Sequence, residues 1–337
     1  MKRVFLCFIV LALLRLPAFA SCIEVQPTII SRSNAQDRVW VGTFQLVWND
    51  FIDKYIRIPI KFREGTPLIV HELNQKLFTT SSLSEKNYYK YLGHITNNTK
   101  KNINKSIKKK FNEKSDILDN LDLTPGSDRF LIYAMLKKDF EFINEFDKLG
   151  EFPFGKNKTS EYFGVTKNTD DIVKKGVKVL FYNNPNDFAV LLNTKDKDEV
   201  YLYKNGSNKD FLSLYKDLRL KTSGFKGEKI LGADDELKIP NIKLDVTKTF
   251  DELTNKRIMS TNIMISEAIE TIKFNMDNKG VKLKSEAAMT FVTTALNPNK
   301  ANPRLFYLDD TFVIFLKEKD KKSPYFALRV NDISKFQ

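Results

Sequence analysis

The chain of 337 residues contains few of the side chains that carry out acid–base or nucleophilic catalysis. His71 and His94 are its only histidines, and a catalytic triad needs a base that a third group orients toward a serine or cysteine. No G-x-S-x-G segment supplies such a serine, and no phosphate-binding glycine loop occurs. Each histidine is therefore interpreted as an ordinary surface or partly buried residue, and no enzymatic activity is expected.

Candidate metal ligands are also sparse. Asp234, Asp235 and Glu236 form an acidic cluster, but the cluster precedes a strand-like segment. It lacks the spaced oxygens and the turn glycine of a calcium loop. The sequence therefore predicts neither a metal site nor a cofactor.

Lysines gather between Lys100 and Lys114, in a chain whose formal net charge is +13. Such a stripe can bind an anionic polysaccharide or lipopolysaccharide by charge, with Lys108, Lys109 and Lys110 as candidate residues. A solvated helix face is the alternative, because lysine and asparagine are abundant along the whole chain. No Gly-aromatic RNA-binding motif or zinc spacing accompanies the run, so nucleic acid is not expected as a partner.

The segment KGVKLKSEAAMTFVTTAL, residues 279–296, begins like a strand and ends like a loop. Successive side chains of a strand point to opposite faces, so one face here carries Val281, Leu283, Ser285, Ala287 and Met289, and the other carries Lys282, Lys284, Glu286, Ala288 and Thr290. All the charge falls on one face. Two structures fit this pattern: a loop that is able to enter a sheet, or an amphipathic edge strand that never moves. Gly280 itself also fits a turn or a bulge.

Three segments in the C-terminal half resemble serpins, in the order in which that family has them. FLKEKDKKSPYFALRVNDI (315–333) looks like the end of a serpin, LKIPNIKLDVTKTFDELTNKRI (237–258) resembles a strand that leads into a short helix, and ISEAIETIKFNMDNKG (265–280) resembles the strand before the reactive-centre loop. The sequence departs from the family at Glu270-Thr271, where His-Lys is usual. It departs again at Asn278-Lys279-Gly280, where Glu-Lys-Gly or Glu-Glu-Gly is usual.

The resemblance implies that a protease cleaves an exposed loop, whose hinge side then enters a sheet as a new strand. It places the hinge at Gly280, Val281, Leu283, Ser285 and Ala287, and the residues after Gly280 are expected to stand exposed before cleavage. Counting back from a strand near Thr311 gives Lys300–Ala301 as the scissile bond, which suits a trypsin-like protease. Counting forward from Gly280 gives Thr294–Ala295, which suits an elastase-like protease.

The predicted function is thus inhibition of a serine or cysteine protease, which would be the main partner. The alternative is a non-inhibitory serpin-like protein that binds through its basic surface or associates with the cell envelope. A monomer is expected in either case.

The N-terminus has the pattern of a secretory signal. Lys2 and Arg3 precede an apolar run from Val4 to Leu14, and Ala18-Phe19-Ala20 fits signal peptidase cleavage. Cleavage after Ala20 predicts a secreted or periplasmic bacterial protein, with a lipoprotein at Cys22 as the less favoured alternative. Cys22 would then be the sole cysteine, so no intramolecular disulfide is expected.

Residues 21–337 are expected to form a single α+β domain, with N-terminal helices packed on large mixed or antiparallel sheets. Helical spacing of Phe44, Trp48, Phe51 and Tyr55 predicts a buried stripe on a helix between Val39 and Tyr55. Further helices are predicted around Tyr88, Tyr89, Leu92 and Ile95, along the lysine-rich run as far as Asp122, and over 208–220. Strands are predicted over 129–136, 177–183, 187–204 as a hairpin, 236–246, 262–277, 304–318 and 324–330.

Overall fold

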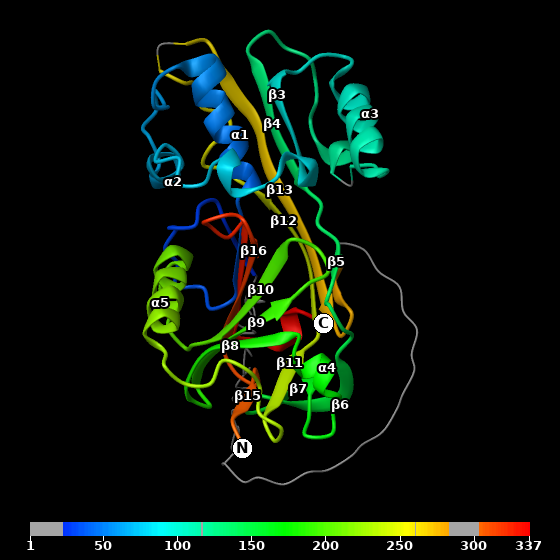
Figure 1. Cartoon of the computed structure of the whole chain (residues 1–337). Helices are drawn as coiled ribbons and strands as arrows, with labels where there is room; N and C mark the ends of the chain where they lie inside the picture. Colours follow the sequence, from blue (N-terminus) through cyan, green and yellow to red (C-terminus); the bar gives the residue numbers. More distant parts are fainter. Residues whose placement is uncertain (1–22, 116, 260, 283–302) are drawn as a thin grey trace, which may run out of the picture.

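The computed structural model describes residues 23–115, 117–259, 261–282 and 303–337 of the chain. Three β-sheets of seven, six and four strands form an elongated molecule, with short helices around its upper end and along its sides (Figure 1). Helices and sheets with both parallel and antiparallel neighbours confirm the predicted α+β class. The loop predicted near the C-terminus falls within residues 283–302 and lies outside the described residues.

The seven-stranded sheet has the order β1-β2-β17-β16-β10-β9-β8, and all neighbours pair antiparallel except β1 and β2. Every residue of the central strand β16 is buried. Because both faces of this strand are covered, its sequence FVIFL is continuously apolar. The strands are β1 Glu24–Gln26, β2 Arg38–Val41, β8 Val177–Asn184, β9 Asp187–Asn193, β10 Asp198–Lys204, β16 Phe312–Glu318 and β17 Phe326–Val330.

The four-stranded sheet at the lower end has the order β15-β11-β7-β6. Its strands are β6 Asp147–Phe154, β7 Lys158–Val165, β11 Glu236–Pro240 and β15 Leu305–Tyr307. A side chain at Gly164 would collide with the carbonyl oxygen of Leu237, so glycine is what lets β7 and β11 pair at this point.

The six-stranded sheet runs along the long axis of the molecule (Figure 1) with the order β3-β4-β13-β14-β5, and β12 also pairs with β13. Its strands are β3 Tyr88–His94, β4 Arg129–Leu136, β5 Phe140–Glu141, β12 Ile242–Thr249, β13 Met264–Asp277 and β14 Gly280–Lys282. β13 runs parallel to β4 and antiparallel to β12 and β14. This sheet holds the segments that resemble the hinge region of serpins.

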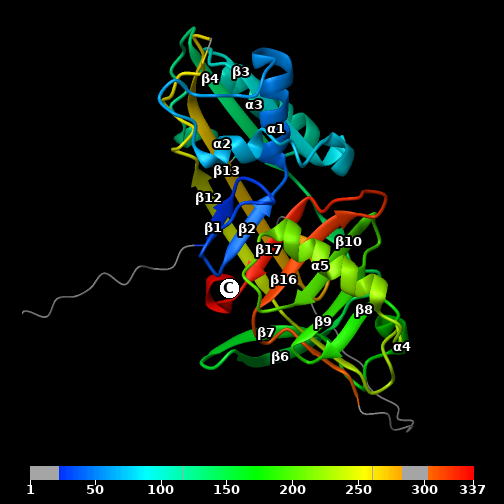
Figure 2. The ribbon, with the colours of Figure 1, turned by 90° about the vertical axis from the view of Figure 1, so that its left-hand side faces the viewer.

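The α-helices are α1 Thr43–Phe51, α2 Leu68–Leu73, α3 Thr99–Phe111, α4 Asp171–Lys174 and α5 Phe211–Gly224, and a π-helix, Ile52–Ile56, continues α1. Short 3-10 helices cover Thr80–Ser82, Glu85–Asn87, Leu118–Asn120 and Ile333–Lys335. α5 lies across the seven-stranded sheet (Figure 2), and its Phe211 and Tyr215 rings pack on Phe315 of β16.

Most of the predicted elements are confirmed. All the predicted strand segments contain strands, 187–204 forms the β9–β10 hairpin, and 208–220 overlaps α5. Phe44, Trp48 and Phe51 of α1 are buried as expected, but Tyr55 is 44 % exposed, so the prediction of a fully buried stripe was wrong at its last residue.

Three helix predictions need correction. Tyr88–His94 is the strand β3 and not a helix, because its side chains alternate between the two faces of a ladder with β4. The first helix begins at Thr43, after the strand β2. The lysine-rich helix α3 ends at Phe111, well before Asp122. The next residue, Asn112, adopts a left-handed backbone conformation that terminates the helix.

Candidate functional site

The strand β13 changes partner along one of its edges. From Met264 to Ile269 it pairs in parallel with β4, and from Asn275 to Asp277 it pairs antiparallel with β14. β14 in turn pairs with β5, so it lies between β13 and β5. Neighbouring strands lie about 4.8 Å apart. The distance from β13 to the segment that runs from β4 to β5 therefore grows from one strand spacing beside β4 to two beside β5.

The placement of β14 corrects the expectation that the residues after Gly280 stand exposed. Val281 is fully buried, and it pairs with Met276 on one side and Phe140 on the other. Gly280 makes this close fit possible, since a Cβ there would collide with the carbonyl oxygen of Phe140 and lie 2.7 Å from the Cα of Glu141. The predicted exposure is thus wrong for Val281, and for residues 283–302 it lies outside the described part of the chain.

Between the two paired regions lies an unpaired stretch that we call the slot. One wall is Glu270–Phe274 of β13. The other wall is residues 134–138, which follow Tyr133, the last residue of β4 that pairs with β13. No ladder pair joins these walls within the described part of the chain. A strand that continued β14 in register would set its next five residues opposite Phe274 to Glu270 on one side and Lys138 to Ala134 on the other.

The two registers meet at one point. The sixth residue of such a strand would fall opposite Ile269 on one side and Tyr133 on the other, and these two residues are themselves a parallel β13–β4 pair. Because both walls give the same answer, the slot accepts five residues before any described pair must break.

The two faces of the slot differ in chemistry. On the core side, Phe274, Ile272 and Leu136 are apolar neighbours, and a cavity of about 30 Å³ also touches Tyr325 and Phe326. On the outer side, Thr271, Lys273 and Lys137 line a cavity of about 60 Å³. A strand that fills the slot therefore needs apolar or small side chains on the core face and tolerates polar ones on the outer face.

A carboxyl group lies on the core face at the narrow end of the slot. Glu270 is 2 % exposed, and burial raises its pKa to about 8 although Thr43 and the backbone of Phe44 offer hydrogen bonds. Thr43 Oγ1 donates to one carboxyl oxygen at 3.3 Å, while the other oxygen has no partner among the described residues. The boundary between β13 and β4, which we call the seam, thus keeps Glu270 largely protonated at neutral pH.

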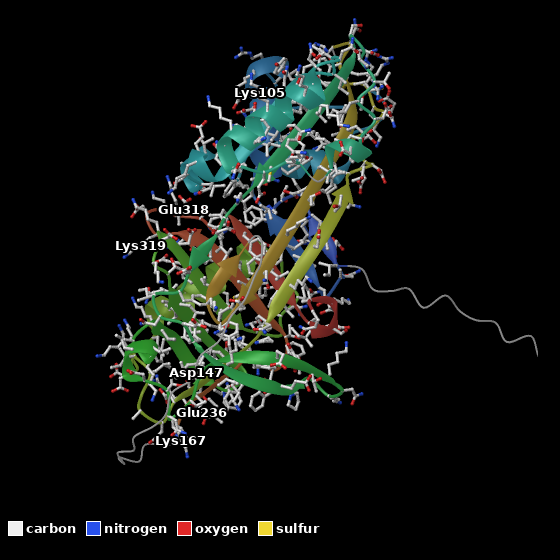
Figure 3. All side chains as sticks on the ribbon, turned by 90° about the vertical axis from the view of Figure 1, so that its right-hand side faces the viewer. Lys105, Asp147, Lys167, Glu236, Glu318 and Lys319 are labelled. Atoms are coloured by element: carbon white, nitrogen blue, oxygen red, sulfur yellow. The ribbon has the colours of Figure 1, made fainter. Side chains whose placement is uncertain are left out.

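A buried ionic cluster anchors the opposite wall to the seven-stranded sheet. Lys138 Nζ donates to both carboxyl oxygens of Asp198 at 2.8 and 3.0 Å and to Glu318 at 2.8 Å. Tyr325 donates to Asp198 at 2.8 Å. Burial opposes ionisation of Glu318, but hydrogen bonds from Lys138 and Ser84 outweigh it and lower the pKa of Glu318. Figure 3 places Glu318 near the middle of the molecule, between Lys105 on α3 and Asp147 at the lower end.

A second hydrophobic core covers the closed part of the seam. It is separate from the main core and is built from the residue after β3, from α3 and the chain that follows it, and from β4 and β13: Ile95, Ile103, Ile107, Ile117, Leu118, Leu131, Tyr133 and Ile269. The Tyr133 hydroxyl also donates to Ser115 Oγ at 3.1 Å. This core includes Ile269 and Tyr133, the pair at which the slot ends, so it resists separation of β13 from β4.

The structure places only part of the predicted site. Gly280 and Val281 lie in β14, whereas Leu283, Ser285, Ala287, both scissile-bond candidates (Lys300–Ala301 and Thr294–Ala295) and Cys22 lie outside the described residues. Lys108, Lys109 and Lys110 are exposed on α3. They line neither cavity of the slot, and they form a separate candidate surface.

The remaining candidates have structural roles or exposed positions. Asp235 binds Arg304 at 2.6 Å, so the acidic cluster helps to hold β15 beside β11. His71 and His94 are exposed, and His94 packs its ring on Phe130. Within the described ranges, no group of three His, Cys, Asp or Glu side chains is placed to hold a metal ion.

Sequence reasoning missed the walls of the slot. Glu270 was noticed as a departure from the serpin pattern, but Lys138 drew no attention because it reads as one of many surface lysines. The available signal was a charged residue on the apolar side of a strand pattern, since such a residue needs a buried partner or a shifted pKa.

Among the described residues, no helix combines the length and the apolar character needed to cross a bilayer. Neither a protein-family profile nor a curated protein sequence matches the chain.

Solved structures do resemble the fold. The chain is similar to Serpin48 of the insect Tenebrio molitor, with 14% identity over 80% of this chain and 72% of that one and a TM-score of 0.42. It is similar to human thyroxine-binding globulin (12% identity) and to a serpin from Schistosoma mansoni (11%), each over 69% of this chain and 64% of the other and each with a TM-score of 0.43. Two of these three structures are named as serpins, the family that the C-terminal segments of the sequence resemble.

Proposed function

We propose that this chain is an exported serpin-like protein that inhibits a serine or cysteine protease by cleavage and insertion of the loop after Lys282. Export is inferred from the signal-like residues 1–20, and the inhibitor family from the three C-terminal segments. The structural observation that supports the mechanism is the slot, because β14 already runs toward it between two walls.

In this proposal, Leu283 to Ala287 continue β14 and fill the slot. Ala288 and later residues enter only when the parallel pairs from Ile269–Tyr133 to Met264–Arg129 separate. The incoming strand is antiparallel to both neighbours, and antiparallel pairing is slightly more stable per residue than parallel pairing. Insertion thus replaces one parallel ladder by two antiparallel ones.

The side-chain pattern of the loop matches the two faces of the slot. Leu283, Ser285 and Ala287 continue the face of the buried Val281, which packs in the core. Lys284 and Glu286 continue the outer face, where Lys284 would stand opposite Lys273 and Lys137. Glu113 and Asp245 already pair with Lys137 and Lys273, at 2.9 and 3.6 Å. Like charges directly opposite one another still destabilise a sheet, so we expect Lys284 to oppose insertion weakly.

The rival function is a non-inhibitory serpin-like protein that binds an anionic surface. Two observations favour it: the second core clamps the seam at Ile269 and Tyr133, and α3 exposes Lys108, Lys109 and Lys110. In this case β14 is a permanent short strand and the loop never enters further.

The two functions give different products with proteases. The purified protein is incubated with trypsin-like and elastase-like proteases and analysed by denaturing electrophoresis, with mass spectrometry to locate the cut at Lys300–Ala301 or Thr294–Ala295. A denaturant-resistant complex supports inhibition, together with a higher melting temperature of the cleaved chain. Clean cleavage with no complex and an unchanged melting temperature contradicts it.

A matched pair of loop variants tests the register. Ser285→Glu would bury an unpaired charge between Ile272 and Leu136, at a cost of about 3–5 kcal/mol, and we expect it to abolish both the complex and the rise in melting temperature. Lys284→Glu introduces the same side chain one residue earlier, on the outer face beside two lysines, and insertion should persist or increase. Equal effects of the two variants would show that the loop does not enter in this register.

The rival is tested by binding to heparin and lipopolysaccharide. Replacing Lys108, Lys109 and Lys110 by Gln should weaken a salt-sensitive interaction if these lysines form the surface. Unchanged binding of the triple variant removes them from the account.

A further inference from the structure

The strand β3 forms one edge of the six-stranded sheet. Within the described residues, β4 is the only strand that pairs with it, and the ladder runs from Tyr88–Leu136 to His94–Phe130 without a register shift. The opposite edge of β3 is therefore a row of backbone groups with no strand beside it in the described part of the chain.

The hydrogen bonds at the two ends of the ladder show which groups face outward. Lys137 N donates to Asn87 O at 2.9 Å and Ile95 N donates to Arg129 O at 3.0 Å. Hydrogen-bonded and non-hydrogen-bonded pairs alternate in an antiparallel ladder, so the residues with odd numbers bond β4. Lys90 and Leu92 consequently turn both N–H and C=O outward, and Tyr88 C=O and His94 N–H extend the row.

The edge strands of the other two sheets are protected. β6, at the edge of the four-stranded sheet, contains a register shift between Lys148 and Gly150 and a proline at position 153. β1 and β15 have three residues each, and β8 receives a bridge between Lys178 and Ile230. Natural sheets use short edges, bulges and prolines to prevent the addition of foreign strands. β3 has seven residues and neither a bulge nor a proline.

A groove of about 440 Å³ follows this edge between α1 and α3. Its lining is aromatic and basic and comes from four elements and the turn before β3: Asp50, Lys54, Tyr55, Glu85, Tyr88, Tyr89, Lys90, Tyr91, Leu92 and Lys110. Tyr55 is 44 % exposed and offers a ring surface to a side chain in the groove.

The charge around the groove selects the class of partner. Lys54 and Lys90 share a single carboxylate, Asp50, at 2.9 and 2.7 Å. Lys110 donates to the backbone oxygen of Glu85 at 2.7 Å, so its charge is not neutralised by that bond. Lys110 is the α3 residue that lines the groove, and α3 itself contains no acidic residue. The lining thus holds three lysines against two carboxylates, those of Asp50 and Glu85, and this excess of positive charge favours a chain that carries carboxylates.

We propose that the outer edge of β3 binds an acidic, extended segment of a partner protein by strand addition. Backbone hydrogen bonds to Lys90 and Leu92 supply affinity, and alternate side chains of the added strand meet the lysines and tyrosines of the groove. This site is independent of the slot, which lies on the far side of β4 from β3.

The first test uses a fluorescein-labelled heptapeptide of alternating Glu and Val and measures fluorescence anisotropy. An added strand bonds its neighbour through alternate residues only. N-methylation of one alternate set of peptide nitrogens should therefore weaken binding by about tenfold or more, the equivalent of about 1.4 kcal/mol. N-methylation of the other set should change it less than about twofold. Equal effects of the two sets, or no binding of the peptide, overturn the proposal.

Controls separate strand addition from charge alone. A heptapeptide of alternating Lys and Val should bind at least about tenfold more weakly than the acidic one, on the same scale. A sulfated polysaccharide that binds when the acidic peptide does not would identify a polyanion surface in place of a strand site, which also overturns the proposal.

Protein variants locate the site. Leu92→Pro removes an outward N–H at an edge position where proline is compatible with the ladder, and we expect it to weaken the peptide by about tenfold. If this variant fails to fold, Lys54→Gln combined with Lys110→Gln replaces it, and the peptide affinity should fall by a similar factor. Lys105→Gln on the same helix is the matched control (Figure 3), since Lys105 does not line the groove. An equal loss with Lys105→Gln contradicts the assignment.

Discussion

In the seven-stranded sheet the strands from β2 to β8 are joined by antiparallel ladders, and the central strand β16 is buried along its whole length. In the six-stranded sheet, one edge of β13 pairs with β4 at its start and with β14 at its end. Between Glu270 and Phe274 this edge has no strand partner in the described chain. The interior strands of the first sheet pair with a neighbour on each side, whereas β13 in the second has an unpaired stretch. The seven-stranded sheet is therefore complete in its interior, and the six-stranded sheet is the one that gains pairing under the proposed function.

The side chains that line the two sheets differ accordingly. Phe312–Leu316 of β16 meet apolar neighbours from both faces. The slot, in contrast, has a buried carboxyl at one wall and a buried ammonium group at the other, Glu270 and Lys138. Buried ionisable groups weaken packing relative to apolar ones, which fits the opening of the seam that the proposed function requires.

The largest expected effect breaks the completed sheet. Phe315→Ala removes a fully buried ring from β16 that packs on Phe211 and Tyr215 of α5. We expect the free energy of unfolding to fall by about 3–5 kcal/mol, measured by urea denaturation. Ile230→Ala, at a residue that is 64 % exposed, is the control and should change it by less than about 0.5 kcal/mol. A comparable effect of both variants would contradict the assignment of the core.

The next effect concerns the carboxyl group in the seam. The pKa of Glu270 is about 8 in the folded chain against 4.5 for the free group, because burial disfavours its charge. Between these two values the folded state binds a proton that the unfolded state has released, so this group makes stability fall as pH rises from about 4.5 to about 8. Glu270→Gln should abolish this slope and stabilise the protein above pH 8 by up to a few kcal/mol.

Thermal or urea unfolding from pH 5 to 9 measures this slope. Glu267→Gln is the matched control on the same strand, because Glu267 is only partly buried and burial raises its pKa less. A wild-type slope that survives in Glu270→Gln would place the titrating group elsewhere.

A smaller and more local effect is expected at the hinge. Gly280→Ala adds a Cβ that collides with β5, so β14 should leave the sheet and expose Val281. Loss of that burial costs at most about 1.5–3 kcal/mol, and hydrogen exchange should show lost protection at Val281 with little change in β16. Gly224→Ala is the control, since no atom lies within 4 Å of a Cβ at that position. Full protection of Val281 in Gly280→Ala would mean that β14 is not wedged against β5.

The smallest effect is expected at a surface ion pair beside β5, which serves as a comparison for the buried ionic cluster of Lys138. Lys195 binds Glu141 of β5 at 2.7 Å, but both side chains are more than half exposed, at 58% and 59%. Lys195→Gln should therefore change stability by no more than about 1 kcal/mol, and less at high salt. A larger loss in a melting experiment would assign to this pair the anchoring that we attribute to Lys138.

Secondary structure could be predicted where one pattern dominated. The apolar runs of β16 and β17 and the turn between β9 and β10 leave little choice of structure. The helix predicted from Tyr88 to Ile95 was wrong. Apolar residues at positions 88, 89, 92 and 95 fit a helix, whereas the strand β3 forms by pairing with β4, which is distant in the sequence.

For the candidate site, the sequence predicted the local strand pattern but not the position of the strand in the sheet. The alternation after Gly280 indicated a strand with one apolar face, and Val281 does face the core. That Gly280–Lys282 already occupies the sheet could not be predicted, because it depends on the distance between β13 and β5. The role of Lys138 was hidden for the same reason, since its partners Asp198 and Glu318 are 60 and 180 residues away.

The amino-acid sequence by itself determined the class of the fold, the position of most strands and the two-faced character of the chain after Gly280. These properties follow from the period of apolar side chains, which is local. Only the tertiary structure decided where β13 changes partner, how many residues the slot accepts and that β3 lies at an edge of the sheet. Those depend on the register between strands and on the packing of distant side chains, which no local pattern encodes.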